Sequence, residues 1–235
     1  MTHWPPHYKV RHSKRVKSVS LRLYSGHGLE IVVPDGKRKF DALAFLNTHR
    51  DWVEKHAAKF KIKLHDDDQN IFPDKIELRA LNSLAEIIYR PIAAADNMSF
   101  QCEKNKIIFY GAIHDFSACL PFITQWLKKQ AKIHLKKMID ALSVSCQLPY
   151  RKLSIRAQKT VWGSCTANAD IQLNYKILFL PESLARYTLI HELCHTIHMN
   201  HSVSFWKKVA SYVPDFRIHV SLLKEADQFI PRWLC

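Results

Sequence analysis

The spacing of apolar residues in the first half of the chain predicts mainly β-strands. Apolar and polar residues alternate over 17–23 and again over 29–33, with a Ser-Gly-His-Gly segment between the two runs. This alternation is typical of strands that bury one face, so we expect a β-hairpin. Two further hairpins are expected, from the pairs of apolar runs 76–81 with 84–89 and 98–102 with 107–110.

A helical pattern lies between the first hairpin and the other two. Asp41 can cap a helix that runs to about Lys61, with apolar residues at helical spacing along it. The polar run 65–70 then shows no apolar periodicity, which indicates a linker or an exposed loop. Its three consecutive Asp residues lack the alternate spacing and the glycine of a calcium loop.

The second half of the chain has mainly helical periodicity. An apolar stripe predicts a long helix from about Ser117 to Leu142, and its lysines project away from that stripe. They form either a solvated surface or the wall of a groove for an anionic ligand. Residues 153–165 are interpreted as a strand that ends in a tight turn, and 171–175 as its return. Further helices are expected from Pro181, after His201 and after Pro214.

These elements predict an α+β fold. We expect a β-rich N-terminal region with one helix over residues 1–115, and a mainly helical domain with a small sheet over residues 116–235. No internal repeat or phosphate-binding glycine loop is visible, and the chain contains only five glycines.

The helix expected after Pro181 carries a candidate zinc site. His191 and His195 are four residues apart, so their imidazoles lie on one helical face, about 6 Å apart along the axis. Glu192 stands next to the first histidine, where its carboxylate can accept a proton from water without binding the metal itself. This His-Glu-x-x-His pattern predicts a zinc ion with a general base beside it.

Two histidines compete for the role of third protein ligand. His198 would lie about 10.5 Å of helical rise from His191, which is too far for three imidazoles to share one tetrahedral ion. His201 can converge with the other two if the helix ends near Met199 and Asn200 and the chain turns back, and Asn tolerates the left-handed conformation that ends helices. We therefore predict His191, His195 and His201 as the metal ligands.

Composition limits the setting of this site. With 47% hydrophobic residues among 235, the chain can bury a full core. It has no apolar run of signal-peptide or transmembrane length, and its six cysteines form no CxxC pair, so we expect a cytoplasmic protein with free thiols and no membrane partner. Cys194 projects away from the histidines and is expected in the core. The net charge of +14 makes a nucleic-acid partner possible.

Several motifs, in one order along the chain, resemble the YgjP-like metallopeptidase family. These are Arg156, Gln158-Lys159-Thr160, Trp162-Gly163-Ser164-Cys165, Asn174, the segment His191 to His195, His198 to Ser202, and Phe205-Trp206. The resemblance implies a zincin-type core with zinc on His191, His195 and His201 and with Glu192 as the catalytic glutamate. Val161 departs from the arginine expected before the Trp-Gly-Ser-Cys turn.

Two other families share part of the zinc motif. The zinc helix and its third histidine are similar to those of the SprT-like and WLM proteases, which act on DNA-bound proteins. Metzincins have Gly where this chain has His198 and need a downstream Met turn, and no Met follows Met199 here.

Three functions follow from the sequence. The first is zinc-dependent hydrolysis of a peptide bond in a peptide or protein substrate, with Glu192 as the general base. The second is hydrolysis of a phosphoester or nucleotide by the same metal, which the basic surplus motivates. The third is a basic nucleic-acid-binding module with a structural zinc, although structural sites usually fill all four positions with protein ligands.

Overall fold

The computed structural model describes residues 4–6, 8–24, 28–36, 40–59, 72–92, 95–113, 115–158 and 160–234. Within them the chain forms two compact units, one from residues 1–69 with 227–235 and one from 70–226. The domain boundary predicted between residues 115 and 116 stays a prediction. The tip of the first hairpin at 25–27, the expected helix end at Lys61, the polar run 65–70 and Lys159 lie outside the described residues.

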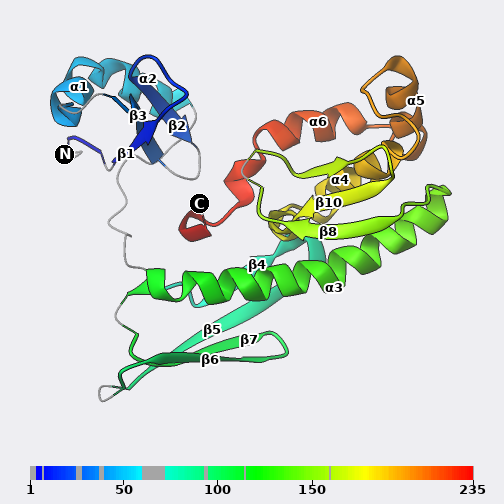
Figure 1. Ribbon diagram of the computed structural model, residues 1–235, viewed down its shortest axis with the longest axis horizontal. Coiled ribbons are helices and arrows are strands. Elements are labelled where there is room, and N and C mark those ends of the chain that lie inside the picture. Colours follow the sequence, from blue (N-terminus) through cyan, green and yellow to red (C-terminus); the bar gives the residue numbers. More distant parts are fainter. Residues whose placement is uncertain are drawn as a thin grey trace. The chain divides into compact units, whose positions relative to one another are not determined.

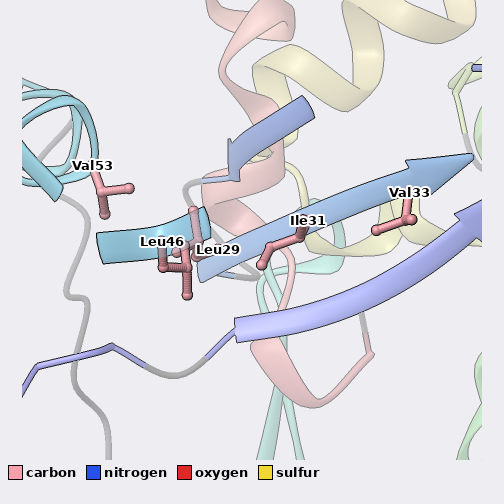
Figure 2. Packing of buried hydrophobic residues seen from close by; sticks show 5 residues of the cluster. All are labelled: Leu29, Ile31, Val33, Leu46 and Val53. Carbon is pink, nitrogen blue, oxygen red and sulfur yellow. The ribbon is translucent and has the colours of Figure 1, made fainter. Parts of the chain in front are cut away.

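The first unit contains a three-stranded sheet and two short helices. Strand β3 (Gly28–Pro34) lies between β1 (Tyr8–Ser13), to which it is parallel, and β2 (Ser20–Tyr24), to which it is antiparallel. The predicted hairpin is therefore confirmed. Figure 2 shows the core of this unit, in which alternate residues of β3 pack with side chains from both helices: Leu29, Ile31, Val33, Leu46 and Val53.

The helix predicted from Asp41 is divided into two. Asp41 caps α1 (Ala42–Thr48) by accepting hydrogen bonds from the backbone N–H groups of Leu43 and Ala44, as expected. The helix then breaks at His49 and resumes as α2 (Arg50–Lys59). The hydroxyl of Thr48 and the ring of His49 both bind the carbonyl of Phe45, so side chains take an acceptor that the helix would otherwise use.

The second unit begins with a four-stranded sheet that contains the other two predicted hairpins. β4 (Lys75–Leu78) pairs antiparallel with β5 (Ser83–Pro91), and β6 (Met98–Glu103) pairs antiparallel with β7 (Lys106–Gly111). A short 3-10 turn, η1 (Arg79–Leu81), separates the first pair, and β5 joins β7 in parallel. Phe122, near the start of the next helix, packs on Phe100 and Phe109 of this sheet.

The long helix α3 (Leu120–Cys146) follows the short 3-10 turn η2 (Phe116–Ala118) and is the longest element in Figure 1. It begins and ends a few residues later than predicted and buries the expected apolar stripe. It packs against α4 (Glu182–Cys194) and against the 3-10 segment η3 (Tyr175–Phe179). The remaining elements are α5 (Val203–Tyr212), α6 (Phe216–Lys224) and two 3-10 turns, η4 (Ala226–Phe229) and η5 (Arg232–Leu234).

The third sheet differs from the prediction. The segment expected as one strand contains β8 (Lys152–Arg156) and β9 (Gly163–Cys165), and both pair with β10 (Asp170–Asn174), which lies between them. β8 runs parallel to β10, whereas β9 runs antiparallel to it. The predicted turn and return describe only β9 and β10. The predicted α+β class is confirmed, and no described helix is long and apolar enough to span a membrane.

We expect Leu135→Ala to lower the free energy of unfolding by about 2–5 kcal/mol, because Leu135 is fully buried and its loss leaves a cavity beneath α3. Ile133, two residues earlier and 53% exposed, provides the control. Ile133→Ala should change the free energy of unfolding by less than about 0.5 kcal/mol. Urea titration of the two variants checks this expectation. Equal effects would mean that the buried face of α3 is assigned wrongly.

Candidate metal centre

The histidine-bearing helix α4 ends earlier than the sequence predicts. Its last residue is Cys194, and His195 is the C-cap. The backbone N–H groups of Thr196 and Ile197 then bond to the carbonyls of Leu193 and Cys194, each three residues earlier, which tightens the final turn. The expected end at Met199 and Asn200 is therefore wrong, and Asn200 is not among the described residues with positive φ.

The chain nevertheless turns back, as the choice of His201 requires. Ser202 caps α5 by accepting a hydrogen bond from the backbone N–H of Phe205, so a new helix starts directly after His201. His201 thus lies in the short link between α4 and α5. Ending α4 several residues early gives this link more length in which to bring His201 back.

Three imidazoles meet at this point. Nε2 of His191 lies 3.2 Å from Nε2 of His195 and 3.0 Å from Nε2 of His201. Two nitrogens bound to one tetrahedral zinc at about 2.0–2.1 Å would be about 3.3 Å apart. Among the described residues these three form the group that can hold a metal ion, and His198 is not part of it. The donor set and its spacing therefore fit a metal ion.

Hydrogen bonds at the far side of two rings orient them. Nδ1 of His195 lies 2.9 Å from the carbonyl oxygen of His198. A carbonyl can only accept, so Nδ1 carries the proton and Nε2 is left free for a metal. Nδ1 of His191 lies 3.4 Å from the hydroxyl of Tyr187, one helical turn earlier. Such partners hold a ligand's ring orientation and protonation state.

The aromatic side chains of α5 surround the imidazoles. Phe205 stacks on His195 with ring centroids 4.4 Å apart, and Trp206 stacks on His201 with centroids 5.4 Å apart. Phe205 also meets His191 edge-on. These rings limit the movement of the imidazoles and exclude water from one side of the group.

The environment keeps the buried histidines in the form that binds metals. Burial, together with the neighbouring His195 and His201, lowers the pKa of His191 to about 3. Burial also lowers the pKa of His195. Both rings therefore remain neutral near pH 7, and a neutral imidazole has a lone pair available for a metal.

Glu192 is the second component of the site. The residue is 5% exposed, and burial raises the pKa of its carboxyl to about 8. Its Oε2 has no hydrogen-bond partner among the described residues. A buried carboxylate without such a partner is unfavourable unless a cation lies nearby, which is a second reason why the site fits a metal ion.

Strand β9 packs directly against this carboxylate. A Cβ atom at Gly163 would lie 2.7 Å from Cγ, Cδ and Oε1 of Glu192, closer than real side chains approach. Glycine at this position therefore lets the backbone of β9 contact the carboxyl group. The sequence indicated a tight turn near Gly163, but it did not reveal this contact because the two residues are far apart in the chain.

Asn174 holds the segment that leads into β9. Its side chain is buried, and its Nδ2 donates hydrogen bonds to the carbonyls of Gln158, at 2.8 Å, and Val161, at 3.1 Å. Its backbone N–H donates to the carbonyl of Trp162. One residue at the end of β10 thus fixes the chain just before Gly163.

Two further residues near the histidines were missed by sequence reasoning. The ring of Tyr187 stacks on His219 of α6, with centroids 5.2 Å apart, and His219 is itself buried. The position of Tyr187, four residues before His191, could have indicated its contact with that ring. His219 carried no such signal, because α6 approaches α4 only in the folded structure.

Arg156, named in the sequence analysis, ends β8 and is exposed, opposite Asn174 in the sheet.

The chain was compared with known protein families, curated proteins and solved structures. The family described as YgjP-like, metallopeptidase domain, matches residues 17–226. No curated protein matches the chain. Solved structures that are similar to parts of it include two metallopeptidase zymogens. The metallopeptidase zymogen abylysin of Pyrococcus abyssi is 25% identical over 37% of this chain and 94% of its own, with a TM-score of 0.33. The zymogen jannalysin of Methanocaldococcus jannaschii is 21% identical over 40% of this chain and 96% of its own, with a TM-score of 0.35.

The family match covers most of the chain and includes all three clustered histidines and the buried glutamate. The motifs that suggested this family in the sequence lie within the same range. The chain therefore belongs to the YgjP-like metallopeptidase family and is a peptidase.

Proposed function

We propose that this protein is a zinc-dependent peptidase of the zincin type, in which His191, His195 and His201 bind the metal and Glu192 is the general base. The observation that carries the proposal is the convergence of three imidazoles at a helix that also carries the buried Glu192, the residue after His191. Three imidazoles suit zinc, and a three-ligand set leaves one position for water or substrate, as in catalytic zinc sites.

Each residue of the site would have a distinct role in the proposed reaction. A zinc ion bound by these histidines would supply a Lewis acid for the scissile carbonyl and would lower the pKa of the attacking water. Glu192 accepts the proton of that water and can pass it to the leaving amine. Tyr187 and the carbonyl of His198 hold two of the imidazoles in place. Gly163 and Asn174 keep β9 against the carboxylate.

The position of β9 supports a peptide or protein substrate. β9 is an edge strand of its sheet and pairs with β10 on one side. It also packs against α4, which carries the histidines. An extended peptide could add to the other side of β9 by backbone hydrogen bonds, which would place its carbonyl groups near the metal.

The ligand assignment predicts different effects of two nearby histidines. His201→Ala removes one of three ligands, so zinc affinity should fall by more than about 100-fold. His198→Ala should lower it by less than about tenfold, because the backbone carbonyl that orients His195 remains. Competition with a chromogenic chelator measures both affinities. Weaker zinc binding by His198→Ala than by His201→Ala would show that the third ligand is placed wrongly.

The assignment of the general base predicts loss of activity without loss of metal. Glu192→Gln should retain about one equivalent of zinc but lower peptide hydrolysis by roughly 10²- to 10⁴-fold. Glu182→Gln, at the exposed first turn of the same helix, should leave hydrolysis unchanged. The measurements are metal content and cleavage of a casein-like protein. Full proteolysis by zinc-loaded Glu192→Gln would exclude Glu192 as the base.

The contact between Gly163 and Glu192 predicts a third effect. Gly163→Ala should displace the carboxylate and lower kcat by about 10²-fold, the effect expected of a misplacement near 1 Å, while zinc affinity changes little. Gly36→Ala is the matched control, because no atom lies within 4 Å of a Cβ at that position. Steady-state kinetics and chelator competition on both variants test the contact. An unchanged kcat in Gly163→Ala would contradict it.

A further inference from the structure

We propose that the exposed side of α3, together with the tip of the β6–β7 hairpin, binds the phosphate backbone of nucleic acids without selecting a base sequence. Helix α3 carries five lysines and only one acidic residue, Asp140. Four of these lysines form one row, which we call the lysine row and which comprises Lys128, Lys129, Lys132 and Lys136. Neither the metal centre nor the proposed peptidase reaction uses this surface.

Helix geometry defines the lysine row. Lys128, Lys129 and Lys136 lie within about 60° of Lys132 around the helix axis, and Lys129 and Lys136 are about 10.5 Å apart along it. All four are exposed. Lys137 belongs to the same helix but points about 140° away from Lys132. The row is therefore a linear array of cations along one side of α3.

The charges of the row are mostly uncompensated. Asp140 pairs with Lys136 and also accepts a hydrogen bond from Tyr150. In the described part of the chain, no carboxylate lies within ion-pair distance of Lys128, Lys129 or Lys132. Lysines three and four residues apart on a helix repel one another, which destabilises the helix modestly. A row of this kind gains stability when an anionic ligand binds along it.

The β6–β7 hairpin extends the basic surface beside α3. Lys104, at the tip of the hairpin, lines a groove of about 290 Å³ together with Lys129, and Gln125 and Gln130 contribute amide groups to the same groove. Lys128 lines a second groove, on the other side of Gln125. Amide and ammonium groups are donors that contact phosphate oxygens in nucleic-acid complexes. The two grooves thus add donors on both sides of the row.

The composition of the surface favours a nucleic acid over an acidic protein. Lysine is depleted at protein–protein interfaces, where aromatic and arginine side chains provide most of the binding energy. A row of lysines instead matches the regular negative charges of a nucleic acid, and the chain's net charge of +14 attracts any polyanion. Lysine is a point charge that lacks the bidentate geometry with which arginine reads guanine, so we expect binding without sequence preference.

The test measures binding of the full chain to fluorescently labelled 20-nucleotide single strands and duplexes by anisotropy at several salt concentrations. Wild type should bind with a Kd of roughly 1–100 μM near physiological salt. Lys129→Gln/Lys132→Gln should weaken binding at least about tenfold and reduce the salt-dependence slope by about 1.4 on single strands or 1.8 on duplexes. Glutamine keeps the helix propensity of lysine, so α3 should remain folded.

The matched control is Lys75→Gln/Lys137→Gln, which removes the same charge from exposed positions outside the row. It should change the affinity less than about threefold, and circular dichroism should be unchanged in both double variants. Equal weakening by the two pairs would assign binding to net charge and overturn the proposal. Binding weaker than about 1 mM would do the same. Tighter binding of poly-glutamate than of either oligonucleotide would assign the surface to an acidic protein instead.

Discussion

The contact between the carboxyl group of Glu192 and the backbone of β9 at Gly163 constrains the whole site. A buried carboxyl group prefers its neutral form, and burial alone accounts for the raised pKa of Glu192. The close approach of β9 keeps one side of this group free of water, and only glycine permits it. Glu192 can act as a base only if a positive charge nearby offsets the cost of burying its carboxylate. A metal ion would provide that charge, and the three neutral imidazoles are close enough to one another to hold it. In the proposed mechanism, the metal and the base therefore depend on each other.

The rigidity of this arrangement comes from the central position of α4. The helix buries residues on most of its circumference and packs against α3, α5, α6 and β9. Side chains on such a helix have little freedom, so His191 and Glu192 keep their directions. Only His201 comes from a link rather than a helix, and stacking on Trp206 restrains it. His201 is exposed, which is consistent with a site that must admit a substrate.

The clustering of His191, His195 and His201 could be predicted from the sequence more completely than the pairing of the strands. The spacing of His191, Glu192 and His195 is a local property of one helix, and the limited reach of imidazoles excluded His198 without further information. The end of α4 was placed several residues too late because local hydrogen bonds to the carbonyls of Leu193 and Cys194 end it. The prediction that His201 joins the other two histidines did not depend on the residue at which α4 ends. Any turn between the helix and His201 brings the chain back toward His191 and His195.

Pairing between distant strands could not be read from periodicity. Alternation of apolar residues shows that a segment is a strand but does not give its neighbour, so the parallel pairing of β8 with β10 was missed. The same limit applies to the contact of Gly163 with Glu192 and to the hydrogen bonds of Asn174. In each case a residue from one part of the chain determines the geometry of a distant segment. A single sequence does not show which distant segments come into contact.

Different physical effects act on the metal centre and on the lysine row of the second unit. Burial and the neighbouring histidines account for the lowered pKa of His191, and no lysine of α3 contributes to the pKa of His191, Glu192 or His195. Exposed lysines are also screened by salt over about 10 Å at 0.1 M ionic strength. Helix α3 therefore supports α4 with its buried side chains and presents cations with its exposed ones.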